Sequence, residues 1–123
     1  MKIKKFYFKS INSTNDKAIK IIKKTKIKFG IIIAETQKKG RGRYGKKWIS
    51  IKGNLFITIF FSLDKIEKSL SEFTKINCQL VKKVLSRYTK EKVTIKYPND
   101  LMIKNKKFCG ILQETINKSN KNF

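Results

Sequence analysis

The chain contains no histidine, only one proline and only two cysteines among its 123 residues. The absence of histidine excludes the common zinc sites, and it excludes any mechanism that depends on a histidine general base or a histidine-containing nucleophilic triad. Cys78 and Cys109 lie far apart in the sequence and form no CxxC motif. We therefore interpret both as reduced thiols that fill the core, which is the usual state of cysteine in the cytoplasm.

Acidic residues are also scarce, because eight aspartates and glutamates stand against 31 lysines and arginines, for a formal net charge of +23 at pH 7. One interpretation of this charge is a nucleic-acid partner. The other is a bias of composition, because the lysines are spread along the whole chain, whereas a dedicated binder concentrates arginine with exposed aromatic side chains. We predict nonspecific attraction to nucleic acid at low salt but no specific nucleic-acid partner.

Long apolar runs are missing as well. None approaches the roughly 20 residues that a membrane-spanning helix needs, and the basic N-terminus does not continue as a secretory signal. Hydrophobic residues nevertheless make up 40% of the chain and aromatic residues 11%, which argues for a folded core rather than disorder. Without repeats or flexible linkers, residues 1–123 are predicted to form one domain in the cytoplasm, with no membrane partner.

Hydrophobic periodicity predicts two main helices and about six strands. One helix runs from the cap-rich segment 12–16 to about Lys24, with Ala18, Ile21 and Ile22 inward, and the other covers residues 69–87. The expected strands are 5–9, 29–36, 55–63, 93–96, 101–103 and 107–115, and a turn at 104–106 joins the last two into a hairpin. This order predicts the α+β class with a mixed or antiparallel sheet, and a frayed polar tail over 117–123.

The most informative segment is residues 37–48, where three glycines alternate with cations before the single tryptophan. Two of the three arginines, Arg41 and Arg43, lie in it. Glycine lets the backbone approach a ligand closely, and arginine presents a planar fork to an oxyanion. The glycine spacing has the form of the dinucleotide fingerprint GxGxxG, but no predicted helix follows Gly45. We interpret the segment as a mobile loop for a small anion, with a nucleotide as the first candidate.

Three further segments carry polar groups at defined places. Asn99 and Asp100 follow Pro98 at a strand end, where a carboxylate can hold Mg²⁺ near a triphosphate or orient an attacking amine. Lys107 precedes a strand glycine, Gly110, over which a ligand can pass. A Ser-Thr-Asn sequence at residues 13–15 opens a helix and offers hydroxyl and amide groups. Taken alone, each has an ordinary structural explanation: a turn, a surface lysine or a helix cap.

In this order and spacing, the four segments closely resemble the catalytic domain of biotin–protein ligases. The family pattern is a Ser-Thr-Asn turn, a GRGRxGRxW loop, a KWPND segment and a KxxGIL strand. The chain has these patterns at residues 13–15, 40–48, 96–100 and 107–112. The resemblance implies the α+β fold shared with lipoate ligases and class II aminoacyl-tRNA synthetases. It also implies an enzyme that uses ATP and Mg²⁺ to convert biotin to biotinyl-5′-AMP, and then transfers biotin to a lysine of the carrier domain of acetyl-CoA carboxylase.

The resemblance further implies a role for each matching residue. Residues that line the biotin pocket or bind its ureido ring are Ser13, Thr14, Asn15 and Gln37. Loop residues that cover the ligand, hold the adenylate or pack near the adenine are Gly40, Arg41, Gly42, Arg43 and Trp48. Residues that face the phosphates, the metal, the incoming amine or the developing charge are Asn99, Asp100, Lys107 and Gly110. Among them, Arg43, Lys107 and Asp100 are expected to be catalytic, and Asp100 is the candidate Mg²⁺ ligand.

The sequence departs from the family pattern in a few places. Tyr97 replaces the family tryptophan, and Lys46 replaces an arginine. The printed sequence has no helix-turn-helix segment before the Ser-Thr-Asn turn, and it ends without the GxGIN-like strand and the small C-terminal β-domain of the family. It therefore corresponds to the N-terminal part of the catalytic domain. The alternatives are an inactive remnant, a lipoate ligase-like enzyme and a basic nucleic-acid-binding protein, and the resemblance is compatible with a homodimer.

Overall fold

The computed structural model describes residues 2–123, which form two compact units. Unit 1 combines the chain up to Lys65 with the segment Thr115–Phe123, and unit 2 is the intervening segment Ile66–Glu114. Both units contain helix and sheet, which confirms the predicted α+β class. No helix among the described residues is long and apolar enough to span a membrane.

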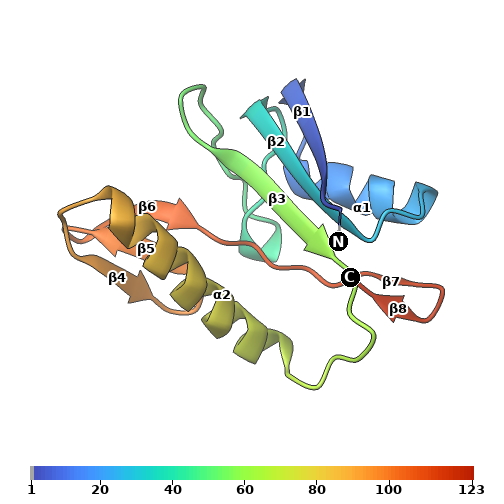
Figure 1. The fold of residues 1–123 in the computed structure, drawn as a ribbon. Coiled ribbons are helices and arrows are strands. Elements are labelled where there is room, and N and C mark those ends of the chain that lie inside the picture. Colours follow the sequence, from blue (N-terminus) through green and yellow to red (C-terminus); the bar gives the residue numbers. More distant parts are fainter. Residues whose placement is uncertain (1) are drawn as a thin grey trace. The chain divides into compact units, whose positions relative to one another are not determined.

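Unit 1 contains a mixed three-stranded sheet in the order β1-β2-β3. Strand β1 (Lys4–Ile11) is parallel to β2 (Phe29–Gln37), and β2 is antiparallel to β3 (Phe56–Phe61). Helix α1 (Thr14–Lys24) connects the parallel pair and lies against the sheet (Figure 1). The helix begins as predicted, because the Ser13 hydroxyl accepts a hydrogen bond from the backbone N–H of Asp16 at 3.2 Å.

The core of unit 1 lies between α1 and one face of the sheet. Its buried residues are Ala18, Ile21, Ile22, Ile32 and Phe60, so the three helix positions predicted to face inward are confirmed. Gly30 stands next to Phe60 in the sheet register, and a Cβ atom at Gly30 would lie 2.4 Å from the Phe60 ring. Glycine is therefore needed there because the aromatic ring occupies the space of a side chain.

The segment 117–123 is not frayed, and our prediction for it was wrong. Strands β7 (Asn117–Lys118) and β8 (Lys121–Asn122) form a hairpin that Ser119 and Asn120 close with positive φ angles of 51° and 60°. Phe123 packs against the core of unit 1 and exchanges two backbone hydrogen bonds with Ile116, at 2.8 and 2.9 Å. These tertiary contacts order a stretch whose polar composition predicts disorder.

Lys118 caps the C-terminal end of α1. Its Nζ donates to the carbonyl oxygens of Ile22 and Thr25, both at 2.6 Å. A cation at this end of a helix also interacts favourably with the helix dipole.

We expect Lys118→Met to lower the free energy of unfolding of unit 1 by about 1–2 kcal/mol, because two charge-assisted hydrogen bonds are lost. Urea unfolding followed by the fluorescence of Trp48, the single tryptophan, reports on unit 1. The control is Lys20→Met at an exposed position of α1. Equal unfolding midpoints for the two variants would contradict the capping role.

Unit 2 contains α2 (Leu70–Leu85), the short 3₁₀ helix η2 (Ser86–Tyr88) and an antiparallel sheet in the order β4-β5-β6. The strands are β4 (Val93–Lys96), β5 (Asp100–Ile103) and β6 (Lys106–Gly110). Helix α2 begins with a capping box in which Ser69 and Glu72 bind each other's backbone N–H groups. These hydrogen bonds hold the pKa of Glu72 below its ordinary value.

The last strand of unit 2 is shorter than the predicted segment 107–115, because β6 ends at Gly110. The backbone after it binds Asn99 instead of a neighbouring strand. The N–H of Ile111 donates to the Asn99 carbonyl oxygen at 2.9 Å, and Asn99 Nδ2 donates to the Ile111 carbonyl oxygen at 3.1 Å. Asn99 therefore uses its backbone and its side chain to hold residue 111.

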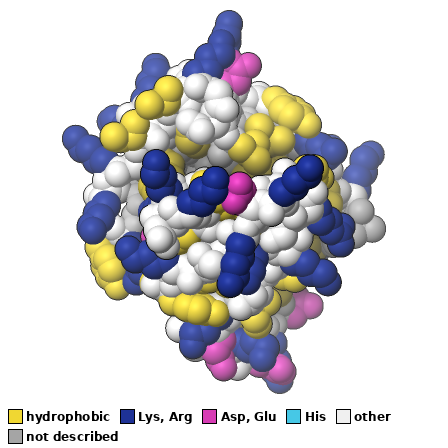
Figure 2. Space-filling view, turned by 90° about the vertical axis from the view of Figure 1, so that its left-hand side faces the viewer, with side chains coloured by type: hydrophobic (Ala, Val, Ile, Leu, Met, Phe, Trp, Pro, Cys, Tyr) yellow, Lys and Arg dark blue, Asp and Glu magenta, His cyan; other side chains and the backbone are white. Residues whose placement is uncertain are grey.

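The basic side chains are not gathered in one place on the face that Figure 2 draws. On the face seen in Figure 2, lysine and arginine side chains project from all parts of the outline, and hydrophobic and uncharged areas separate them. This distribution agrees with the lysine spacing in the sequence. On this face there is no continuous basic stripe of the kind that is typical of dedicated nucleic-acid-binding proteins.

Candidate functional site

The polar residues at the start of α1 are buried in unit 1. Ser13 and Thr14 are only 4% and 5% exposed. The Oε1 atom of Gln37, at the end of β2, accepts hydrogen bonds from the backbone N–H of Thr14 at 2.7 Å and from its hydroxyl at 3.1 Å. Gln37 thus satisfies a free N–H at the N-terminus of α1 from a position 23 residues away. The structure therefore brings together the Ser-Thr-Asn turn and Gln37, as the resemblance implies.

Thr58 on β3 belongs to the same network, and the sequence analysis did not identify it. Its hydroxyl lies 2.8 Å from Thr14 Oγ1 and also within hydrogen-bond distance of Asn15 Oδ1. A hydroxyl carries one hydrogen, so Thr58 can donate to one of these oxygens at a time. A threonine in a strand is ordinary, and its partners lie more than 40 residues earlier, so no local signal marks this residue.

The glycine-rich loop forms a closed hairpin. The N–H of Trp48 donates to the Gly40 carbonyl oxygen at 2.8 Å, and the N–H of Gly42 donates to the Lys46 carbonyl oxygen at 2.7 Å. The short 3₁₀ helix η1 (Arg43–Gly45) makes the tip. No α-helix follows Gly45 before β3, which agrees with our rejection of the dinucleotide fingerprint. The mobility of the loop stays a prediction.

The base of this hairpin is tightly packed around Gly40, which is buried. A Cβ atom there would lie 2.7 Å from the Trp48 carbonyl oxygen and 2.6 Å from Ser50 Oγ. Ser50 itself accepts a hydrogen bond from Gln37 Nε2 at 3.0 Å and donates to the Trp48 carbonyl oxygen at 3.2 Å. Gln37 therefore links the start of α1 to the base of the loop through both ends of its side-chain amide.

The two arginines of the loop have different partners. Arg41 Nε and Nη2 donate to Asp16 Oδ1 at 3.1 and 2.7 Å, so this side chain is held against the first turn of α1. The Arg43 guanidinium lies 4.8 Å from the centre of the Tyr44 ring and donates to its hydroxyl at 2.8 Å. Tyr44 is 87% exposed, so this cation–π pair holds Arg43 at the solvent-facing tip of the loop.

The remaining predicted site residues lie on one hairpin of unit 2. Asp100 is opposite Gly110 in the register of β5 and β6. Lys107 Nζ lies 3.0 Å from Asp100 Oδ1, and the two side chains are 39% and 19% exposed. This buried carboxylate oxygen accepts no hydrogen bond of good geometry from the described residues, so the ammonium of Lys107 balances its charge. Asn99, Asp100, Lys107 and Gly110 are thus neighbours on the hairpin.

The residues described by the structure supply little for a resident metal. Among residues 2–123 there is no group of three or more histidine, cysteine, aspartate or glutamate side chains that could hold a metal ion. Asp100 supplies a single carboxylate, and Lys107 already neutralises it. A single carboxylate can supply one ligand to an ion that takes its other ligands from elsewhere.

Both thiols of unit 2 lie near Asp100. Cys78 is fully buried in α2 and donates to the Pro98 carbonyl oxygen at 3.2 Å, which confirms the predicted core role for this residue. Burial raises the pKa of the Cys78 thiol, and the Asp100 carboxylate raises it further. Burial, Cys78 and Asp100 together raise the pKa of Cys109. The structure describes both cysteines as free.

We expect both cysteines of the folded protein to react with iodoacetamide at least about tenfold more slowly than a small free thiol at pH 8. A raised pKa leaves less thiolate at this pH, and the thiolate is the reactive form. The rate should increase only above the pH at which an ordinary thiol ionises. Mass spectrometry of samples labelled between pH 7 and 10 measures this onset. In urea both sites should react at ordinary rates, and fast labelling of the folded protein would contradict the expectation.

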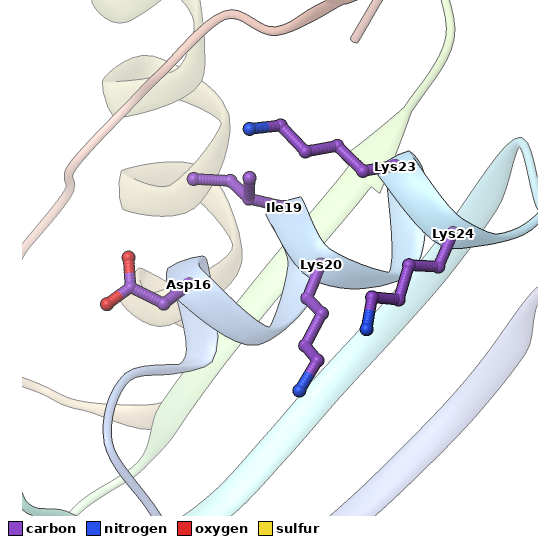
Figure 3. Close-up of a pocket in the computed structure, with 5 residues that line it drawn as sticks. All are labelled: Asp16, Ile19, Lys20, Lys23 and Lys24. Atoms are coloured by element: carbon purple, nitrogen blue, oxygen red, sulfur yellow. The ribbon is translucent and has the colours of Figure 1, made fainter.

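A shallow depression of about 320 Å³ lies on the outer side of α1. Its lining residues are Asp16, Ile19, Lys20, Lys23 and Lys24. In Figure 3 these side chains spread in different directions, with Lys23 and Ile19 on one side of the helix and Lys20 and Lys24 on another. Because they do not converge on a common point, we do not interpret the depression as a binding site.

The fold of this chain is that of biotin protein ligases. The biotin protein ligase of Aquifex aeolicus, solved in complex with biotin and ATP, is 27% identical and superimposes with a TM-score of 0.76 over 97% of this chain and 49% of its own. The biotin acetyl coenzyme A carboxylase synthetase of Helicobacter pylori, solved with bound biotinylated ATP, shares the fold at 22% identity, with a TM-score of 0.74 over 98% of this chain and 58% of its own.

The chain belongs to the Biotin/lipoate A/B protein ligase family, whose sequence pattern matches residues 7–122. Among curated proteins it is similar to the bifunctional ligase/repressor BirA of Escherichia coli, with 36% identity over 88 residues. This match covers 71% of the present chain and 27% of the relative. The chain thus spans about a quarter of the length of that relative, and about half of the solved Aquifex chain.

Proposed function

We propose that this protein activates biotin with ATP to form biotinyl-5′-AMP and transfers the biotinyl group to a lysine of a biotin carboxyl carrier domain. The observation that carries the proposal is the network in unit 1. Thr14, a buried residue of the Ser-Thr-Asn turn, donates two hydrogen bonds to Gln37, and the same glutamine supports the base of the glycine–arginine loop. Neutral polar groups and a cationic loop are thereby joined, which suits a ligand with a neutral polar ring and an anionic group.

In this proposal the neutral part of the network receives the ureido ring of biotin. Thr14, Asn15 and Thr58 offer hydroxyl and amide groups that now bind one another. A ureido group both donates and accepts hydrogen bonds, so it can exchange with these partners without leaving a buried polar atom unsatisfied. Ser13 keeps its role as the helix cap. Gln37 would fix the orientation of the ring, because its amide is anchored at both ends.

The cations of the loop and of unit 2 would act on the anions of the reaction. A carboxylate must meet a phosphate, so each needs a fixed positive charge to reduce their mutual repulsion. Arg41, Arg43 and Lys107 are the candidates. The loop would also exclude water from the adenylate, a mixed anhydride that water hydrolyses, and Trp48 would pack near the adenine. Asn99 and Asp100 would face the phosphates and the incoming amine, and Gly110 would let the ligand pass close to the backbone.

Mg²⁺ would arrive with ATP and neutralise phosphate charge, with Asp100 as its candidate protein ligand. The acceptor in this proposal is the carrier domain of acetyl-CoA carboxylase, and the reaction is assigned to the cytoplasm, where ATP is present and both thiols stay reduced. A homodimer is compatible with the proposal, which requires neither a membrane nor a specific nucleic acid.

The test is ATP- and Mg²⁺-dependent transfer of labelled biotin to a purified carrier domain, with Arg43→Ala as the matched variant. Transfer by the parent chain that falls in the variant would support the full reaction. Pyrophosphate release without transfer would restrict the activity to the first step. A folded protein that neither binds biotin at millimolar concentration nor releases pyrophosphate would overturn the proposal and favour an inactive remnant. Pyrophosphate release that depends on lipoate and not on biotin would favour a lipoate ligase-like enzyme.

A further inference from the structure

The tip of the glycine-rich loop is a tight turn that contains an unusual residue. The backbone N–H of Lys46 donates to the Arg43 carbonyl oxygen at 3.2 Å, so Tyr44 and Gly45 are the two central residues of the turn. Both have positive φ angles, of 56° and 69°. Positive φ at both central positions is typical of a type I′ turn, in which asparagine or aspartate followed by glycine is strongly preferred. The second central position therefore has its preferred residue, and the first does not.

A tyrosine in this backbone conformation is strained. Residues with a Cβ atom seldom adopt the left-handed region, and asparagine does so much more readily than a bulky residue. Among residues 2–123, the other two turns with two successive positive φ angles, at residues 104–105 and 119–120, each contain an asparagine. The Tyr44 side chain is 87% exposed, so its burial cannot offset the strain. Strain that folding does not offset is found most often at functional sites.

The Tyr44 side chain contacts Arg43, the residue directly before it. The Arg43 guanidinium lies 4.8 Å from the centre of the tyrosine ring, and its Nη2 donates to the tyrosine hydroxyl at 2.8 Å. In extended backbone, successive side chains point to opposite sides of the chain, so neighbours seldom meet in this way. The left-handed conformation of Tyr44 turns the chain and allows the two side chains to meet. The strained backbone is therefore linked to the contact between an aromatic ring and this cation.

The ring and the hydroxyl together restrict the guanidinium. The aromatic face attracts the cation, and the directional hydrogen bond to the hydroxyl limits how the guanidinium plane can turn. Among residues 2–123, Tyr44 is the only hydrogen-bond or ring partner of the Arg43 side chain. This hydrogen bond uses one of the five N–H donors of an arginine. Without the tyrosine, the arginine side chain would be free to sample its rotamers at the tip of the loop.

We propose that Tyr44 is a positioning residue, which holds the Arg43 guanidinium ready for the phosphate group of the bound adenylate. The inference rests on the proposed function, in which Arg43 is one of the cations that act on the anions of the reaction. An arginine that is already ordered loses less entropy when it binds an oxyanion, so the affinity for an anionic ligand increases. The loop gives up some stability for this order, because the residues that favour the turn carry no aromatic ring.

The experiment changes the turn residue and compares ligands with and without an anion. Binding of biotinyl-5′-AMP and of neutral biotinamide is measured by calorimetry for the parent chain, Tyr44→Phe and Tyr44→Asn. We expect biotinyl-5′-AMP binding to weaken about threefold in Tyr44→Phe, which loses the hydroxyl, and about tenfold in Tyr44→Asn, which also loses the ring. Biotinamide binding should change in neither variant. Because Tyr44→Asn gives the turn its preferred sequence, its unfolding midpoint in urea should equal or exceed that of the parent chain.

Two controls separate positioning of the arginine from a general effect on the loop. In the Arg43→Gln background, the substitutions at Tyr44 should have no further effect on biotinyl-5′-AMP binding, because the side chain that they act through is gone. The matched control is Tyr88→Leu, since Tyr88 is 83% exposed and lies in unit 2. This variant should bind both ligands as the parent chain does.

Three outcomes would overturn the inference. Tighter binding of biotinyl-5′-AMP by either Tyr44 variant would mean that the tyrosine competes with the ligand for Arg43. An equal loss for both ligands, or an equal loss with and without Arg43, would mean that Tyr44 only shapes the loop. Unchanged binding of both ligands would mean that Arg43 needs no positioning. A parent chain that binds neither ligand would instead overturn the proposed function and the inference with it, so the two failures differ.

Discussion

Lys107→Ala is expected to lower kcat/KM for biotin-dependent pyrophosphate release by about 10²–10³-fold, because one fixed cation beside the developing charge is lost. The structure gives this lysine a defined place, since Asp100 holds its ammonium at 3.0 Å on the hairpin of β5 and β6. The measurement is the initial rate of pyrophosphate release at several biotin concentrations, with ATP in excess.

The matched control for this prediction is Lys106→Ala, because Lys106 is an exposed neighbour on the same strand. It should retain nearly full activity. Lys107→Ala also leaves the Asp100 carboxylate without its cation, which we expect to lower the free energy of unfolding by about 1–2 kcal/mol. The double variant Lys107→Met with Asp100→Asn removes both charges and should recover stability but not activity. Recovery of activity in the double variant would show that Lys107 acts only by balancing Asp100.

Gly40→Ala is expected to weaken biotin binding by at least about tenfold. The new methyl carbon would lie 2.7 Å from the Trp48 carbonyl oxygen, 2.6 Å from Ser50 Oγ and 3.0 Å from Gln37 Nε2. The backbone oxygen cannot move without breaking the hairpin, so the base of the loop has to open. Such overpacking typically costs about 1–3 kcal/mol, and here it separates Gln37 from the loop that it supports. Titration with biotin, followed by Trp48 fluorescence, measures the change.

Gly42→Ala is the control, because the same substitution two residues later meets a different environment. A Cβ atom at Gly42 would lie 3.5 Å from the Lys46 carbonyl oxygen, which is an ordinary contact. Its φ of −104° is also accessible to alanine. The unliganded loop should therefore keep its structure in this variant. If Gly40→Ala and Gly42→Ala show the same tryptophan spectrum and the same unfolding midpoint, the packing argument at Gly40 is wrong.

The elements with strong local signals were predicted well from the sequence. The cap-rich segment before α1 and the apolar spacing of α2 each specify a helix through residues only a few positions apart. Strand β4 has the predicted bounds, Val93–Lys96, because Pro98, the single proline of the sequence, lies two residues after its end. The Ser-Thr-Asn turn and Gln37 are joined in the structure, as the family resemblance implies. In these cases the information lies in short segments of the chain.

The missed residues depend on partners that are distant in the sequence. Thr58, Ser50 and Asp16 contribute through hydrogen bonds to residues 13 to 44 positions away. A threonine in a strand, a serine in a loop and an aspartate in a first helical turn are each common on their own. Only the tertiary structure shows that they converge on Thr14, Gln37 and Arg41. Sequence periodicity carries no information about such contacts.

The C-terminal hairpin was missed for a different reason, because the sequence does contain a turn signal for it. Lys104 and Asn105 close the hairpin of β5 and β6 with φ angles of 50° and 61°, and Ser119 and Asn120 close the last hairpin with nearly the same values. Asparagine tolerates this left-handed backbone, and both turns have two residues. We recognised the first turn because apolar strands flank it. The second was overlooked because its strands are short and polar.

The composition of unit 1 from two separate stretches has a consequence for protein synthesis. Residues 115–123 contribute Lys118 to the end of α1 and Phe123 to the core. They leave the ribosome after every residue of unit 2 has done so. During translation, all residues of unit 2 are available for folding as soon as Glu114 has emerged. The first 65 residues cannot complete the core of unit 1 until residues 115–123 have also emerged. The nascent chain therefore exposes the apolar face of its first sheet for longest, and a chaperone that binds such surfaces would act on unit 1 during this interval.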